Sequence, residues 1–285
     1  MPVMPAAQHS RVTQRSRVTQ GTGDVAATIE GAVAQVLIDR PAARNALSPE
    51  VIAGIGAAID SAAAAGCSVL VIRGAGGTLS AGADLKHLNA IRHDPAALRG
   101  YIGSIGAMVQ RIADAPFVSV AVVEEYALAG GFEILLACDL AVVSEQARLG
   151  DRHLRYGLLP GAGGSVRLAR AAPAAVARRL LYTGEMIDGA SAARAGLVSH
   201  AVPAGQLDAE LAALVARLAG QSRTALRRMK ELYRMATTSR PDVALANERE
   251  TLLRHLGADP GVAEGLAAFA EHRTPDFSQF PGEPS

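Results

Sequence analysis

Two side chains that can transfer protons lie beside glycine-rich stretches of this sequence. Glu133 follows Gly130 by three residues in "ALAGGFEILLACD", and His153 lies between arginines in "RHLRYGLLPGAGG". Carboxylates and imidazoles are common general acids and bases, and histidine changes its charge near neutral pH. A lone histidine beside a turn is by default a packing or surface residue, so its role depends on the elements around it.

Three glycine-rich segments, "GTLSAGADLKHL", "EYALAGGFEILLACD" and "LLPGAGGSVRLAR", each precede a predicted helix start. The first N–H groups of a helix have no partner within the helix, so they can bind an anion or a developing oxyanion. Glycines also make tight turns, which is the plainer interpretation of any one segment alone. Their spacing does not match a dinucleotide fingerprint, a P-loop or a nucleophile elbow. Two segments in order, with Glu133 beside the second, indicate N–H groups that polarise a carbonyl next to an acid or base.

The elements that must position these residues alternate between strands and helices. Continuous apolar runs predict buried strands, the residues around Gly31 predict a hairpin, and Ser48 followed by Pro49 predicts a helix start. This alternation indicates an α/β architecture with helices packed on the faces of a sheet. The predicted strands span 25–30, 33–40, 68–74, 117–123 and 139–145, and the predicted helical stretches span 48–66, 95–114 and 206–272.

The composition limits the class of protein. With 285 residues, of which 49% are hydrophobic, the chain can bury one large aliphatic core. A net charge of +1 creates no global field toward nucleic acid or an anionic membrane. Cys67 and Cys138 lie in apolar runs and are predicted to be reduced thiols of a cytoplasmic protein, and no metal-binding motif is found. No window reaches the roughly 18 apolar residues needed to span a bilayer.

The chain divides into three predicted parts. Residues 1–24 carry no sustained helical or strand pattern and are predicted to form a disordered extension. An acid-free start with arginines is also found in organellar transit peptides, although an amphipathic apolar face is missing. Residues 25–205 are predicted to form the core with the active site, and residues 206–285 a helical region that contacts other subunits or a substrate.

Over residues 25–280 the sequence resembles the enoyl-CoA hydratase/isomerase family, the crotonase superfamily. The resemblance is carried in order by "IDRPAARNALS", "LSAGADLKHL", "ALAGGFEILLACDLAV", "GLLPGAGGSVRLAR", "LYTGEMIDGASAARAGLVSHAVP" and "GLAAFAEHRTPDF". It implies a crotonase-like spiral of ββα units with a helical C-terminal trimerisation region. It also implies an acyl-CoA thioester substrate and a homotrimer or dimer of trimers. No metal and no separate cofactor are expected, because coenzyme A is part of the substrate.

The resemblance also assigns roles to individual positions. It implies that the backbone N–H groups of Ala83 and Gly130 form an oxyanion hole, which would stabilise a thioester enolate. It further implies a set of CoA-binding positions, two of them near the C-terminus. These positions are Ala43, Arg44, Ala81, Asp84, Leu85, Phe269 and Arg273.

At one position the sequence departs from the family pattern. In hydratases of this family one glutamate follows the Gly-Gly turn, which matches Glu133, and a second lies seven residues before the proline of "PGAGG". Counting back from Pro160 places His153 there. One hypothesis is that Glu133 activates a water for attack at C3 of a 2-enoyl-CoA while His153 delivers a proton to C2.

Two other interpretations stay open. The histidine could direct the site to another reaction of this superfamily, such as thioester hydrolysis, carbon–carbon cleavage, decarboxylation or isomerisation. The histidine could also be a bystander, with Glu133 acting alone or not at all, and in the latter case the chain would be a catalytically silent acyl-CoA-binding protein. Among nearby residues, His87 is predicted to pack or face water, Asp151 to cap or fix a loop, and Tyr126 to line the second glycine turn.

A basic stripe is predicted on one helix near the C-terminus. Arg223, Arg227, Lys230 and Arg234 recur at helical spacing. Such a stripe is usually a solvated face, although it could also meet CoA phosphates or, less readily, RNA.

Overall fold

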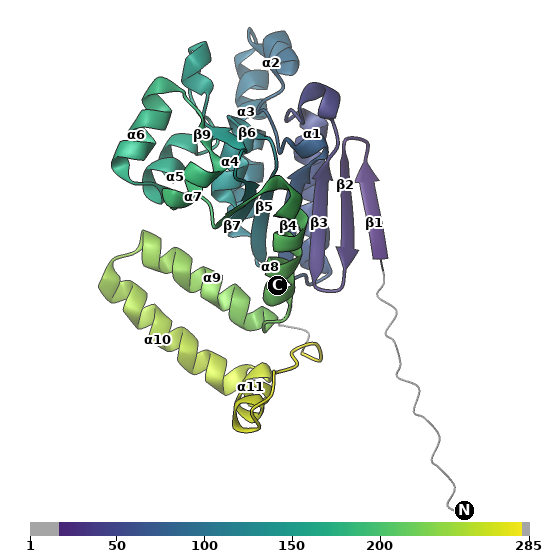
Figure 1. Cartoon of the computed structure of the whole chain (residues 1–285), viewed down its shortest axis with the longest axis vertical. Coiled ribbons are helices and arrows are strands. Elements are labelled where there is room, and N and C mark those ends of the chain that lie inside the picture. Colours follow the sequence, from purple (N-terminus) through teal and green to yellow (C-terminus); the bar gives the residue numbers. More distant parts are fainter. Residues whose placement is uncertain (1–16, 281–285) are drawn as a thin grey trace, which may run out of the picture.

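A computed structural model describes residues 17–280 and shows an α/β body from which a group of C-terminal helices extends (Figure 1). The main sheet of this described part has seven strands in the order β1-β2-β3-β4-β5-β7-β10. Its first three strands are antiparallel and the others join in parallel. The strands are β1 (Arg17–Thr22), β2 (Val25–Glu30), β3 (Val33–Ile38), β4 (Val69–Gly74), β5 (Val118–Val123), β7 (Leu140–Ser144) and β10 (His200–Val202).

At the edge of this sheet, the prediction of a disordered extension over residues 1–24 is wrong in part. The segment 17–22, predicted as part of a disordered extension, is strand β1 and pairs with β2 in register from Arg17 opposite Glu30 to Thr22 opposite Val25. Gly23 has a φ of 55° and makes the tight turn between the two strands. The pairing occupies backbone groups of β2 that would otherwise form an open edge. The rest of the predicted extension, residues 1–16, lies outside the described residues.

The central strands are buried on both faces, as their apolar runs predict. On one face, residues such as Leu70 and Ile72 pack in a large cluster with helices α1 and α3. On the other face, residues such as Val71 and Val120 pack against Leu207 and neighbours on α8. Ser48 caps α1 through the N–H of Val51, which confirms the predicted helix start. The helices that cover the sheet are α1 (Pro49–Ala64), α3 (Pro95–Asp114) and α8 (Leu207–Ala219).

A second, small sheet lies beside the carboxyl ends of β4 and β5. It has the order β6-β8-β9, and the helices α4 and α7 pack against it. Its strands are β6 (Tyr126–Leu128), β8 (Arg148–Gly150) and β9 (Ile187–Asp188). The remaining elements of the body are the helices α2 (Leu85–Ile91), α4 (Gly130–Ala137), α5 (Gly164–Ala171), α6 (Ala174–Thr183) and α7 (Gly189–Arg194), with the 3-10 turns η1 (Pro41–Ala43), η2 (Ala75–Gly77), η3 (His153–Tyr156) and η4 (Ala204–Gln206).

The helical C-terminal stretch forms as predicted. Beyond α8, the helices α9 (Arg223–Thr238) and α10 (Pro241–Ala258) run side by side, and α11 (Gly261–Ala270) lies at the far end from α2 (Figure 1). Many large apolar side chains of these three helices are exposed. They are Met229, Tyr233, Val243, Leu245, Leu252, Leu253, Leu256, Leu266 and Phe269.

The basic stripe on α9 is only partly solvated, because several of its cations contact the body. Lys230 donates to the carboxylate of Asp139 at 2.8 Å and to the carbonyl of Phe117 at 2.9 Å. Arg234 pairs with Asp114 at 3.0 Å, and Arg223 donates to the carbonyl of Gly66. Because these cations bind groups of the body, the stripe helps to dock α9.

Two further predictions concern the state of the cysteines and the presence of membrane-spanning helices. Both cysteines are free, with Cys67 buried and Cys138 partly buried. Burial raises the pKa of the Cys138 thiol to about 12. No helix within residues 17–280 is both long enough and apolar enough to cross a bilayer.

Candidate active site

The segment that contains Ala81 and Ala83 is held between two parts of the chain. On one side, the N–H of Leu128 in β6 donates to the carbonyl of Ser80 at 3.0 Å. On the other side, the N–H of Ala81 donates to the carbonyl of Arg44 at 3.0 Å. The predicted CoA-binding residues Arg44 and Ala81 therefore lie together.

Asp84 ends this segment and begins α2. Its carboxylate accepts hydrogen bonds from the N–H groups of Lys86 and His87 at 3.0 and 3.1 Å, so it caps the helix. Its other oxygen pairs with Arg40 at 3.2 Å. Burial alone would raise the pKa of Asp84, but these bonds outweigh it and hold the pKa below its usual range. The carboxylate is thus a fixed anion beside the segment.

The first turn of α4 lies directly against the same segment. A Cβ atom placed on Gly130 would lie 3.2 Å from the Cα of Gly82 and 3.6 Å from the nitrogen of Ala83. Ala129 just before it has φ 49° and ψ −118°, a strained conformation for a residue other than glycine. Within the described residues, neither the Ala83 N–H nor the Gly130 N–H donates to a protein acceptor. The two predicted oxyanion donors are therefore neighbours, and both are available.

Glu133 lies one turn into α4 and is 2% exposed. Its Oε1 accepts hydrogen bonds from the N–H groups of Ala162 and Gly164, at 2.7 and 2.8 Å. These donors belong to the "PGAGG" turn and the start of α5. Burial raises the pKa of the Glu133 carboxyl, although the two N–H groups oppose the shift. The turn fixes one oxygen of the carboxylate and leaves Oε2 outside these bonds.

His153 forms a pair with Asp151 that the sequence interpretation missed. The ring Nδ1 lies 2.9 Å from Oδ1 of Asp151, which also accepts the His153 backbone N–H at 3.3 Å. The second bond fixes the loop, as predicted, and the first adds a contact with the ring. The residue between them, Arg152, has a left-handed φ of 60°. The Asp-X-His spacing alone does not reveal the pair. In an extended backbone, residues two apart lie on the same face, but this does not bring their side chains into contact.

Charge couples the pair to Glu133. Burial alone would lower the pKa of His153, but the hydrogen bond and charge of Asp151 outweigh it, and Glu133 adds to the effect, so the pKa is raised. A Cβ atom on Gly164 would lie 2.5 Å from Oδ2 of Asp151 and 3.3 Å from Cγ of Glu133. One imidazole and two carboxyl groups thus meet around the start of α5.

The remaining predicted residues differ in their positions. Ala43 lies in η1, one residue before Arg44, and Leu85 is 64% exposed at the start of α2. His87 packs edge-on against Tyr101, with ring centroids 4.6 Å apart, as predicted for a packing residue. Tyr126 is partly exposed in β6.

The two C-terminal positions lie away from this group in the same chain. α11 carries Phe269, which is 83% exposed, and Figure 1 shows α11 at the opposite end from α2. Arg273 is held by Glu264 at 2.6 Å and by Glu271 at 2.6 Å. The structure therefore does not bring Phe269 and Arg273 together with the other predicted residues.

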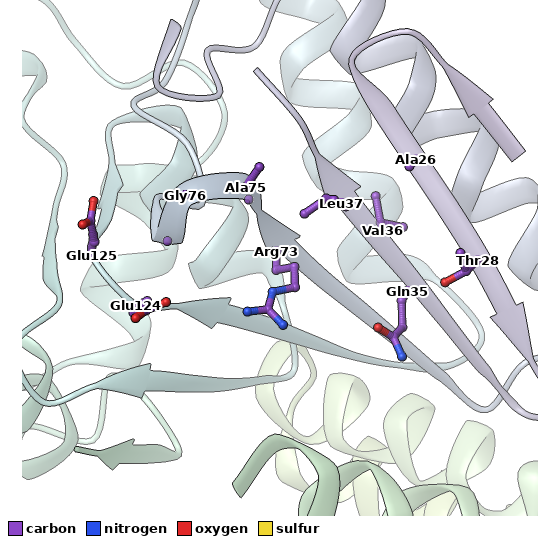
Figure 2. Close-up of a pocket in the computed structure, with 12 residues that line it drawn as sticks. Ala26, Thr28, Gln35, Val36, Leu37, Arg73, Ala75, Gly76, Glu124 and Glu125 are labelled. Atoms are coloured by element: carbon purple, nitrogen blue, oxygen red, sulfur yellow. The ribbon is translucent and has the colours of Figure 1, made fainter. Parts of the chain in front are cut away.

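A separate groove of about 580 Å³ lies on the sheet, between β2, β3, β4 and the glycine turn after β4 (Figure 2). Arg73, Glu124 and Glu125 line it, but none of the predicted site residues does. Arg73 pairs with Asp208 of α8 at 3.1 Å. The groove is therefore distinct from the candidate active site.

Comparison with known proteins finds the same family at the level of family models, curated proteins and solved structures. A family model described as enoyl-CoA hydratase/isomerase matches residues 28–280. A protein named probable enoyl-CoA hydratase from Mycobacterium bovis is 34% identical over 244 residues, covering 85% of this chain and 93% of that protein. A 2,3-dehydroadipyl-CoA hydratase from Escherichia coli is 36% identical, covering 84% and 92%. The crystal structure of an enoyl-CoA hydratase from Polaromonas sp. JS666 has a TM-score of 0.84 and 33% identity, covering 88% and 98%.

Proposed function

Because the chain belongs to the enoyl-CoA hydratase/isomerase family and is an enzyme of the crotonase superfamily, we propose that it adds water to a 2-enoyl-CoA, or removes it in the reverse reaction. The predicted crotonase-type fold is confirmed by the solved structures that it resembles. An acyl-CoA thioester is the substrate class of this family.

The observation that carries the proposal is the pair of available N–H groups on Ala83 and Gly130. A thioester carbonyl bound by both would become an enolate with its charge on oxygen when water adds to C3. Loss of one such donor typically costs about 10²–10³ in rate. Neither role uses a side chain, so the close approach of the two backbones is what matters.

Glu133 and His153 divide the proton transfers. Oε2 of Glu133 takes a proton from water, and the resulting hydroxide equivalent forms a bond to C3 of the substrate. The electron pair of the C2–C3 double bond moves into the enolate, and Nε2 of His153 then gives a proton to C2. Afterwards the glutamic acid is protonated and the imidazole is neutral, so a net proton transfer from Glu133 to His153, directly or through water, restores the starting state.

The same proposal covers substrate binding and assembly. Arg44, Ala81 and Asp84 line the approach to the N–H pair, and the reaction needs no resident cofactor, since coenzyme A is carried by the substrate. We propose a homotrimer or a dimer of trimers, supported by the exposed apolar residues of α9 to α11. Phe269 and Arg273 would then reach a CoA bound to another copy. A light-scattering mass equal to one chain would contradict the assembly.

The direct test mixes the purified protein with crotonyl-CoA and with a longer 2-enoyl-CoA. Loss of enoyl absorbance is followed, and products are identified by mass. Water addition that falls by about 10²-fold or more in both Glu133→Gln and His153→Ala supports the division of roles. Undiminished turnover in Glu133→Gln would contradict it.

A control separates the enzyme from a silent acyl-CoA-binding protein. A saturated acyl-CoA is incubated in deuterated water, and mass spectrometry measures deuterium at C2. An active site of this type exchanges the C2 proton through the enolate, whereas a binding protein holds the thioester without exchange. Tight acyl-CoA binding with neither hydration nor exchange would overturn the proposed function.

A further inference from the structure

We propose that Asp151 is a positioning residue that keeps a proton on Nδ1 of His153, so that Nε2 is the ring atom that exchanges a proton with the substrate. This inference deepens the proposed function and rests on it for the role of Nε2. The contact itself, and the ring tautomer that it selects, can be tested without any substrate.

The geometry defines which ring nitrogen is engaged. Oδ1 of Asp151 lies 2.9 Å from Nδ1 of His153, and Asp151 is 3% exposed. An ionised carboxylate only accepts hydrogen bonds, so the ring must present Nδ1–H to it. In the neutral imidazole the other nitrogen, Nε2, is then the acceptor, and in the imidazolium it is the second donor.

The backbone holds the pair in this arrangement. Arg152 adopts the left-handed conformation, and its guanidinium donates to the carbonyl of Gly184 at 2.8 Å. The same Oδ1 of Asp151 accepts the backbone N–H of His153. The ring and the backbone of His153 are therefore fixed to one oxygen atom, which reduces the freedom of the imidazole to rotate.

Charges around the imidazole favour its protonated form. Asp151 and Glu133 are the anions coupled to it. On α6, which packs against η3, Arg179 is paired with Glu185 at 2.6 Å. Arg152, which precedes η3, donates a hydrogen bond to the carbonyl of Gly184. Burial opposes the positive charge, and the two carboxylates outweigh burial, with Asp151 contributing more than Glu133. The imidazole therefore keeps its proton to a higher pH than an unperturbed histidine does.

The second oxygen of Asp151 argues against a purely structural role. Oδ2 is buried and has no hydrogen-bond partner within the described residues. A serine could accept the loop N–H through its hydroxyl without placing a second, unpartnered oxygen in the interior, where such a group typically costs about 1–3 kcal/mol. Gly164 provides the space, because a Cβ there would lie 2.5 Å from Oδ2. The negative charge of Asp151 is therefore not required to hold the loop at His153.

The first experiment measures the tautomer in the wild-type chain. Nitrogen-15 chemical shifts of the His153 ring are recorded across a pH titration, and the His153→Gln spectrum assigns the signals. We expect the Nδ1–H form at high pH, and a shift in Asp151→Asn that lowers the midpoint by at least about one pH unit, a tenfold change in proton affinity. An Nε2–H form in the wild type, or an unchanged midpoint in a folded Asp151→Asn, overturns the inference.

The second experiment separates positioning from folding. In the wild-type background, Asp151→Asn should lower kcat by at least about tenfold with little change in KM, because the His153 imidazole loses the carboxylate that holds its proton while the substrate contacts remain. The alkaline limb of the kcat profile should move to lower pH. The same change in a His153→Gln background should cost less than about threefold, since no imidazole remains to position.

The outcomes are distinguishable. An equal loss from Asp151→Asn in both backgrounds would mean a structural role and overturn the inference. If no hydration is found at all, the proposed function fails, but the tautomer measurement still decides the Asp151–His153 contact. If Asp151→Asn does not fold, the wild-type ring shifts alone give the answer.

Discussion

Gly131 lies where the first turn of α4 meets the segment that carries Ala83. A Cβ atom at this position would lie 2.1 Å from the carbonyl oxygen of Ser80 and 2.7 Å from its carbon. Both atoms are backbone, and the oxygen already accepts the Leu128 N–H, so no flexible side chain can move aside. Gly131→Ala therefore must push α4 and the 80–83 segment apart.

The size of the effect follows from these distances. The segments must separate by roughly 1 Å before the new contact becomes tolerable. A misplacement of about 1 Å typically costs about 10²-fold in rate, or about 2.7 kcal/mol in transition-state stabilisation. Overpacking of this kind typically destabilises the fold by about 1–3 kcal/mol. We expect kcat/KM for enoyl-CoA hydration to fall about 10²-fold in a protein that still folds.

The assay combines enoyl absorbance with denaturant unfolding, so that the rate is corrected for the folded fraction. Gly103→Ala in α3 is the matched control. A Cβ at Gly103 meets nothing within 4 Å, so this change should stabilise the helix by up to about 1 kcal/mol and leave the rate unchanged. Wild-type kcat/KM in folded Gly131→Ala would refute the link between this contact and the N–H pair.

Three further changes have distinct expected outcomes. Ala129→Gly should relieve a strained backbone and raise the free energy of unfolding by about 1 kcal/mol, whereas Ala137→Gly, at the ordinary helical end of α4, should lower it; denaturant midpoints decide this. Glu133→Gln should raise the Tm at pH 7, because burial raises the carboxyl pKa and the ionised form is disfavoured in the fold; calorimetry should show the gain vanish as pH falls through that pKa, and a constant gain would contradict it. Lys230→Met should lower the free energy of unfolding by about 1.5–3 kcal/mol, since it leaves a charged hydrogen bond to Asp139 unmade; an unchanged denaturation curve would show that α9 docks without it.

Local sequence signals determined most of the elements. The buried strands β4, β5 and β7, the capped start of α1, and the helix that begins at Gly130 follow from apolar runs, capping residues and glycines. The strand β1 was missed, because its stability comes from pairing with β2 rather than from its own pattern. Likewise the basic stripe on α9 predicted a solvated face, because helical spacing does not say which carboxylates the body presents.

In the candidate active site, the sequence predicted the residues but not their contacts. Glu133 and His153 could be singled out by residue type, spacing and family resemblance, but these do not reveal what each side chain contacts. Only the tertiary structure brings the N–H of Ala83 beside that of Gly130. Only the tertiary structure also places Oε1 of Glu133 where it accepts a hydrogen bond from the "PGAGG" turn. It also pairs His153 with Asp151 through one left-handed residue. The physical reason is that periodicity reports which face of an element is buried, whereas contacts between distant backbones depend on how the whole core packs.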